Sequence, residues 1–181
     1  MESSIAQSTL PINEPIPLFT PSTDNPLIAE KEEKKAMEEL KQKKEEICKT
    51  VEGLLSGKDL KRKVLSTDIL SSLHIAERVF ATYPKEKKIL VIFSDMIEES
   101  KDYNFSQDKL LSKRVDDIIL MKRKKGRLPD LAGVKIYITG ATAGTPDKFF
   151  AVQNFWLMYF KECGASLSKE NYGATLLNFD E

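Results

Sequence analysis

The sequence contains few histidines and cysteines, the residues that most often bind transition metals and form disulfides. Its 181 residues include one histidine, His74, and two cysteines, Cys48 and Cys163. The cysteines are far apart and match no metal-binding or redox spacing, so we expect both to be buried free thiols. No acidic or nucleophilic partner for His74 is evident in the sequence, and we expect it to have no catalytic role.

The chain also lacks an excess of either charge and a long apolar run. Lys and Arg total 28, as do Asp and Glu, which gives a net charge of +0. A balanced charge does not favour nucleic acid or an anionic membrane. No run reaches the ~18 apolar residues of a membrane span, and the first residues lack the basic and apolar regions of a signal peptide. We therefore expect no nucleic-acid partner, no membrane span and a cytoplasmic location as written, while a longer form could be exported.

The composition changes sharply near Ile28. Residues 1–27 hold five of the eight prolines, which predicts an extended lead with at most one short strand at Ile16–Phe19. Residues 28–181 have the hydrophobic content of a folded domain. This part begins with a long helix that ends near Gly57, in which Glu30/Lys34 and similar i,i+4 pairs predict a solvated charged face.

Helical and strand patterns then alternate. Ser66 or Thr67 is the expected N-cap of a helix before Pro84, and Ile89–Phe93 is a short apolar run typical of a strand buried on both faces. A helix over 107–124, capped by Ser106, and a strand in "VKIYITG" follow. The next helix has Thr145 as N-cap and Pro146 at its first position. A weak strand in "ATLLNF" is expected after it. The alternation predicts an α/β three-layer sandwich with a mostly parallel central sheet. Only two strands are convincing, which is few for such a sheet.

Asp95 follows the first of these strands directly. Ligands of open α/β sheets bind beyond the carboxyl ends of the strands, and Thr67 should project from the same edge. A carboxylate and a threonine hydroxyl form an oxygen-only set of the kind that Mg²⁺ accepts. The alternative, which the residues leave open, is that Thr67 caps a helix and Asp95 forms a turn.

The turn "TGATAGTP" raises a second possibility. It follows a strand and precedes a helix, and it resembles the phosphate-binding turn of short-chain dehydrogenases. A small Rossmann-like nucleotide-binding enzyme could use the Thr139–Gly144 turn in this way. However, Pro146 replaces the third glycine, and the 41 residues from 141 to 181 are too few for the rest of such a fold. A plain strand-to-helix turn is therefore the preferred interpretation.

Four segments together resemble the von Willebrand factor type A domain, in its divergent bacterial branch. They are "STDILSSLHIAERVF", "KKILVIFSDMIEES", "LAGVKIYITGA" and "FWLMYFKECGASL", within about residues 65–168. The resemblance implies a metal-ion-dependent adhesion site at the carboxyl edge of the sheet. Its parts are an Asp-x-Ser/Thr-x-Ser turn after the first strand, a threonine that Thr67 matches, and a later aspartate that Asp95 matches.

The first part of that site is missing from the sequence. Nothing upstream of Thr67 matches the Asp-x-Ser/Thr-x-Ser turn, so we expect an N-terminally incomplete domain that binds Mg²⁺ weakly through Thr67 and Asp95. The resemblance then implies a non-enzymatic module that binds a protein partner, whose identity the sequence does not define. Two alternatives stay open, the nucleotide-binding enzyme described above and a structural remnant without a ligand.

Overall fold

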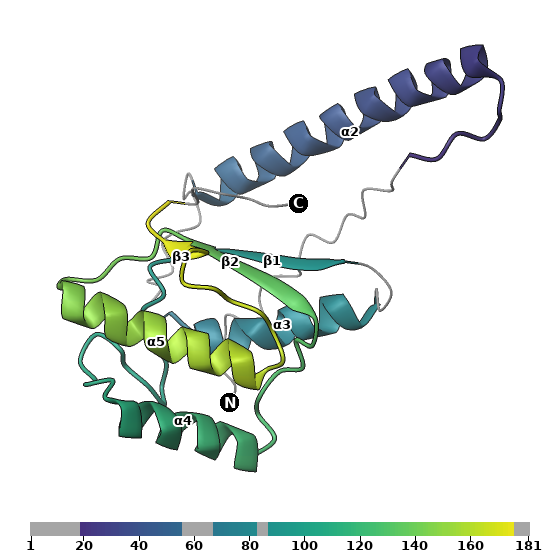
Figure 1. The fold of residues 1–181 in the computed structure, drawn as a ribbon. Helices are drawn as coiled ribbons and strands as arrows, with labels where there is room; N and C mark the ends of the chain where they lie inside the picture. The colour runs from purple at the N-terminus through teal and green to yellow at the C-terminus, as the bar shows by residue number, and fades with distance from the viewer. Residues whose placement is uncertain (1–18, 56–66, 83–86, 176–181) are drawn as a thin grey trace. The chain divides into compact units, whose positions relative to one another are not determined.

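The computed structural model describes residues 19–55, 67–82 and 87–175. The helices and strands in these ranges are α2 (Pro26–Leu55), α3 (Ile69–Thr82), β1 (Lys88–Phe93), α4 (Ser112–Lys124), β2 (Val134–Thr139), α5 (Pro146–Glu162) and β3 (Tyr172–Gly173) (Figure 1). They belong to two compact units, of which one contains α2 and the other contains the sheet with α3, α4 and α5. None of the described helices is both long enough and apolar enough to cross a membrane.

The three strands form one parallel sheet in the order β1-β2-β3. β1 and β2 pair along their full length, with Leu90 beside Ile136 and Ile92 beside Ile138. β3 adds two residues, at Tyr172 and Gly173. The expected α/β class with a parallel sheet is therefore confirmed, whereas most of the "ATLLNF" segment, in which a weak strand was expected, lies outside the described residues.

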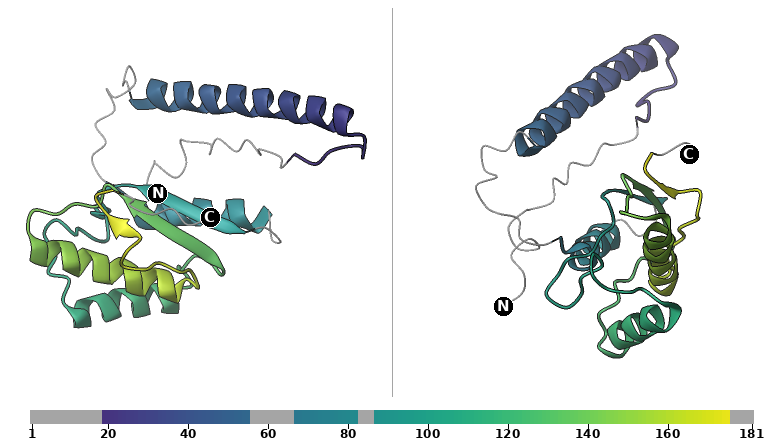
Figure 2. Two further views of the ribbon diagram at one scale, coloured as in Figure 1. Left: turned by 45° about the horizontal axis from the view of Figure 1, so that its top comes forward. Right: turned by 90° about the vertical axis from the view of Figure 1, so that its left-hand side faces the viewer.

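Helices α3, α4 and α5 lie on the same side of the sheet (Figures 1 and 2). The crossovers through α4 and α5 step across the sheet in one direction, and parallel crossovers are right-handed, so both helices must cover the same face. α4 lies on the far side of α5 from the sheet (Figure 1). The core lies between the sheet and these helices and extends to α4. It contains residues of α3, β2 and α5, among them Leu70, Leu73, Ile136, Phe155 and Trp156.

β1 has one face in this core and not two, as the sequence pattern had predicted. Leu90 and Ile92 pack against the core cluster, whereas Phe93 is 82% exposed. Successive side chains of a strand point to opposite faces, and none of the described helices of this unit covers the second face. An unbroken apolar run therefore does not show here that both faces are covered.

Neighbouring residues determine where α5 and α4 begin. α5 begins as expected, because Thr145 Oγ1 accepts a hydrogen bond from the Lys148 backbone N–H at 3.3 Å and Pro146 takes the first position. α4 begins at Ser112, so the expected start at 107 is wrong. Asn104 forms a turn there, with its side-chain oxygen 3.2 Å from the Gln107 nitrogen, and the chain stays non-helical to residue 111.

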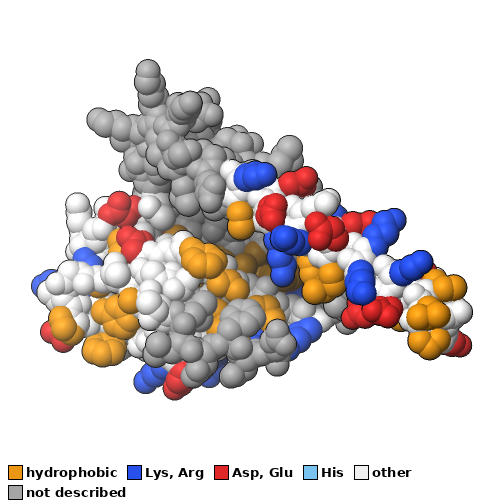
Figure 3. Space-filling view, turned by 90° about the horizontal axis from the view of Figure 1, so that it is seen from above, with side chains coloured by type: hydrophobic (Ala, Val, Ile, Leu, Met, Phe, Trp, Pro, Cys, Tyr) orange, Lys and Arg blue, Asp and Glu red, His pale blue; other side chains and the backbone are white. Residues whose placement is uncertain are grey.

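The predicted long helix is confirmed as α2. It starts where Asn25 Oδ1 accepts a hydrogen bond from the Leu27 N–H at 3.1 Å, and its exposed surface carries the Glu30–Lys34 ion pair at 2.8 Å. Figure 3 shows blue and red side chains mixed along this helix, as the charge pattern predicts. The proposed strand at Ile16–Phe19 lies largely outside the described residues.

Candidate metal centre

The loops that carry Thr67 and Asp95 meet at the carboxyl edge of the sheet. The backbone N–H of Glu99 donates to the Thr67 carbonyl at 2.7 Å, which fastens the start of α3 to the loop after β1. The Thr142 N–H points at the Asp95 carbonyl over 3.4 Å and brings the loop after β2 to the same place. The predicted edge therefore holds both candidate ligands.

Asp95 forms the tight turn that follows β1. Its Oδ1 accepts a hydrogen bond from the Ile97 N–H at 3.0 Å, and the Ser94 hydroxyl lies 3.5 Å from the same oxygen. The Asp95 side chain is exposed, and within the described residues its second oxygen, Oδ2, makes no hydrogen bond. Asp95 is thus a turn former, and one of its oxygens remains available to a ligand.

Thr67 does not cap α3, contrary to one of the two expectations for it. The N-cap is Asp68, whose Oδ1 accepts a hydrogen bond from the Ser71 N–H at 2.9 Å. Ser66, the other expected cap, lies outside the described residues. Because Asp68 performs the capping, the exposed Thr67 hydroxyl is not needed for it.

Glu98 is a buried acidic residue at this edge that the sequence did not reveal. Its carboxyl is fully buried, and Oε2 accepts hydrogen bonds from the first two N–H groups of α3, at 2.8 Å from Ile69 and 3.1 Å from Leu70. The other oxygen, Oε1, has no hydrogen-bond partner among the described residues. Burial raises the pKa of Glu98, because the hydrogen bonds only partly replace lost hydration.

A second charged group lies near Glu98. Burial lowers the pKa of the Lys122 ammonium, and the negative charge of Glu98 opposes that shift. Lys122 Nζ also lies 5.3 Å from the centre of the Tyr103 ring, a cation–π distance. The Glu98 carboxylate therefore has a cation in its surroundings in addition to the positive end of α3.

A hydrogen bond from α5 stabilises the turn after β1. Met96 has a positive φ of 64° and a fully buried side chain. The indole Nε1–H of Trp156 donates to the Met96 carbonyl at 2.9 Å. This bond satisfies a buried carbonyl and fixes the turn next to Asp95, so α5 positions the candidate ligand from the core.

Three backbone amides of the Thr139–Gly144 turn are already used within the protein. The N–H groups of Gly140 and Ala141 donate to the carbonyls of Ala174 and Gly173, at 3.0 Å and 3.1 Å. The N–H of Thr142 points at Asp95, as described above. These amides cannot also bind a pyrophosphate in this arrangement, and Asp147 places a negative charge in the first turn of α5.

The structure shows the hydrogen-bond partner of His74 and the burial of the two cysteines. His74 does have an acidic partner, because its Nδ1 lies 3.0 Å from Oε2 of Glu77, three residues along α3. Glu77 also accepts a hydrogen bond from the Asp130 N–H at 2.8 Å, which lowers its pKa and ties α3 to a loop. Cys163 is buried as expected, whereas Cys48 is exposed, so the expectation for Cys48 is wrong.

The residues at this edge fit a divalent cation only in part. Thr67 supplies one hydroxyl and Asp95 one carboxylate oxygen, whereas Mg²⁺ prefers about six oxygen ligands. Glu98 and Asp68 are committed to α3 through the hydrogen bonds given above. In the ranges that the structure describes, no three His, Cys, Asp or Glu side chains gather as a metal-binding group.

Searches with this chain against protein-family models, curated proteins and solved structures find no match.

Proposed function

We propose that this chain is a non-enzymatic protein-interaction module of von Willebrand factor type A character, with an incomplete metal-ion-dependent adhesion site. The observation that carries the proposal is the hydrogen bond from Glu99 to Thr67. It brings the loop before α3 to the loop after β1 at the carboxyl edge of a parallel sheet. This is the edge at which the family resemblance expects a threonine and an aspartate to meet.

The proposed mechanism uses the free oxygens of both residues. The Thr67 hydroxyl would bind Mg²⁺ directly, and Asp95 Oδ2 would bind it directly or through a water molecule. An open coordination position on the ion would accept an Asp or Glu carboxylate of the partner protein. With so few protein ligands the ion binds weakly, and the partner's carboxylate adds to its coordination.

The three-layer sandwich of the type A domain is part of the same proposal. In a complete three-layer sandwich, a second helical layer would cover the face of the sheet on which Phe93 is exposed. Further strands would then extend the sheet beyond β1, which is at one end of the strand order. Both features are what the resemblance to the type A domain implies.

The test compares the response of the wild-type protein to Mg²⁺ and Mn²⁺ with that of two Asp95 variants. Asp95→Asn keeps an oxygen for the Ile97 N–H and removes the charge, whereas Asp95→Ala removes both. We expect Mn²⁺ binding, followed by electron paramagnetic resonance, to be lost in both variants. Unchanged melting of Asp95→Asn without metal would show that its turn is intact. Equal Mn²⁺ binding by all three proteins would refute coordination by Asp95.

The nucleotide-binding alternative receives less support, because the amides of Gly140, Ala141 and Thr142 already donate to carbonyls within the protein. We expect ATP, NAD and NADP to leave the melting temperature unchanged. A rise that Gly144→Val abolishes would instead favour the enzyme. A structural remnant without a ligand would respond to neither metal nor nucleotide.

A further inference from the structure

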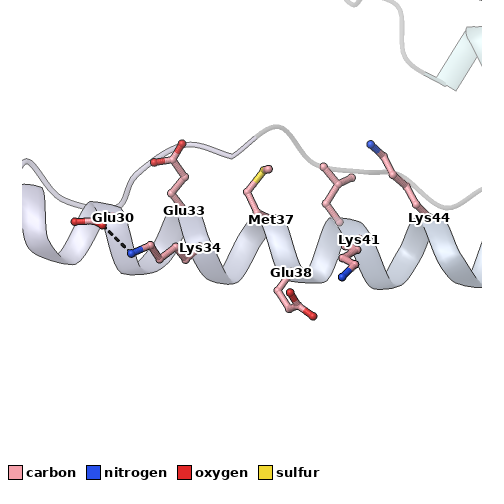
Figure 4. Close-up of a pocket in the computed structure, with 8 residues that line it drawn as sticks. Glu30, Glu33, Lys34, Met37, Glu38, Lys41 and Lys44 are labelled. Atoms are coloured by element: carbon pink, nitrogen blue, oxygen red, sulfur yellow. Dashed lines mark hydrogen bonds and ion pairs between the residues drawn. The ribbon is translucent and has the colours of Figure 1, made fainter.

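One side of α2 carries a set of four side chains, of which three are exposed and one, Leu40, is half-buried. Glu33, Met37, Leu40 and Lys44 follow one another at intervals of four, three and four residues, which places them on one side of a helix. Figure 4 shows Glu33, Met37 and Lys44 projecting from the same side. All four line a shallow hollow along the helix, and Met37 is 63% exposed. We call these four residues the α2 stripe.

α2 is the only helix or strand that the structure describes in its unit. Its 30 residues form a helix whose charged side chains are mostly exposed, with further exposed apolar side chains at Leu27 (75%) and Ile28 (47%). Single apolar residues on a surface need no explanation, but Met37 and Leu40 lie one turn apart on the same side of the helix, between an acidic residue at one end and a basic residue at the other. The α2 stripe therefore has an apolar centre with opposite charges at its two ends.

The order of charges within the stripe distinguishes between possible partners. In a parallel pair of α2 helices, Glu33 would lie against Glu33 of the other copy and Lys44 against Lys44, which is unfavourable. In an antiparallel pair with the two-fold axis between positions 38 and 39, Met37 of one copy faces Leu40 of the other. Glu33 then faces Lys44 at both ends of the apolar centre.

We propose that α2 mediates antiparallel association of two copies of this chain through the α2 stripe. The contact is isologous, because the same surface meets itself across a two-fold axis. Its centre consists of two Met37 and two Leu40 side chains, and the two Glu33–Lys44 pairs set the direction and the register. The stripe includes neither Thr67 nor Asp95, so we expect the association to occur without Mg²⁺.

Sedimentation equilibrium of the full chain tests the association. We expect a concentration-dependent dimer that Lys44→Glu weakens by roughly tenfold or more, because two like-charge contacts replace two ion pairs. Glu33→Lys should have the same effect, and the double variant Glu33→Lys/Lys44→Glu should restore the dimer. Lys35→Glu is the matched control, because it makes the same charge change on the opposite side of α2 and removes an exposed contact with Glu39.

Three outcomes would overturn the proposal. They are a monomer at every concentration, a dimer that Lys44→Glu weakens no more than Lys35→Glu does, and a double variant as weak as the single ones. The direction is tested separately with a spin label on Cys48, which is exposed, whereas Cys163 is buried. An antiparallel pair separates the two labelled positions by about 28 Å along the helix axes. A distance near the ~10 Å spacing of two adjacent helices would indicate a parallel pair and refute the model.

Discussion

Glu98 Oε2 lies 2.8 Å from the backbone nitrogen of Ile69 and accepts the hydrogen bond of the first N–H group of α3. A second bond, from Leu70, makes this buried carboxylate the shared acceptor for two N–H groups that a helix cannot satisfy internally. The positive end of the helix dipole favours a negative charge at this place. Glu98 therefore links α3 to the loop after β1, at the edge where the loops that carry Thr67 and Asp95 come together.

Replacement of Glu98 by alanine should destabilise the protein by about 2–4 kcal/mol, because two buried N–H groups lose their acceptor. Glu98→Gln keeps an oxygen for both groups and should cost less than about 1 kcal/mol. Urea unfolding measured by circular dichroism distinguishes the variants. Equal losses for both would show that the charge of Glu98, and not its hydrogen bonds, stabilises α3.

The pH dependence of stability should show the effect of protonating the Glu98 carboxyl. Its pKa is raised in the folded protein, so the folded state holds this proton more tightly than the unfolded state. The stabilising contribution of Glu98 is therefore fully present below its unfolded pKa and is lost as the pH rises through the folded value.

We therefore expect the melting temperature of Glu98→Gln, relative to wild type, to increase as the pH is raised from 4 to 7. Glu38→Gln, which changes an exposed carboxylate on α2, provides the control and should give a smaller change. A difference between Glu98→Gln and wild type that stays constant over this range would contradict the raised pKa.

Much of the fold could be predicted because the signals are local. Thr145 and Pro146 mark the start of α5, and the apolar runs mark β1 and β2, since capping and strand patterns depend on adjacent residues. The start of α4 was not predictable in this way, because Asn104 forms its own turn before Ser106 can cap a helix. The exposure of Phe93 also escaped prediction, since a run of apolar residues does not reveal whether both faces of a sheet are covered.

The candidate site was predicted only in outline. Topology alone places Asp95 at the carboxyl edge, and the Thr67 carbonyl accepts a hydrogen bond from the Glu99 N–H of the loop at this edge. Glu98 was not identified, because its partners Ile69 and Leu70 are 29 and 28 residues away and no local pattern signals such a contact. A buried acid soon after a strand, near a helix start, is the signal that could have found it.

Trp156 should stabilise the turn that contains Asp95. Trp156→Phe removes the hydrogen bond to the buried Met96 carbonyl and leaves a small cavity, which should cost about 2–3 kcal/mol. Hydrogen exchange of residues 94–98 should accelerate by more than the global loss of stability explains, because the turn loses its anchor. Phe150→Ala, on the exposed side of the same helix, should cost less than about 0.5 kcal/mol. Uniform acceleration across the domain would refute the local role.

Gly140 and Gly144 belong to the same turn but should tolerate substitution differently. Gly140 has a φ of 88°, and an added Cβ would lie 3.4 Å from the Ser94 carbonyl oxygen. Alanine at this position should cost about 1–2 kcal/mol, because L-residues rarely adopt this conformation. No atom lies within 4 Å of a Cβ at Gly144, whose φ is not in the left-handed region, so alanine there should be neutral.

The paired substitutions also separate the two interpretations of this turn. If Gly140 serves only the close approach of β2 to the loop after β1, Gly140→Ala should lower stability and Gly144→Ala should change neither stability nor ligand response. A phosphate-binding turn would need backbone access at both glycines. Urea unfolding, together with melting in the presence of ATP and NAD, measures both properties. A loss of nucleotide-dependent stabilisation in Gly144→Ala would therefore favour the nucleotide-binding enzyme over the interaction module.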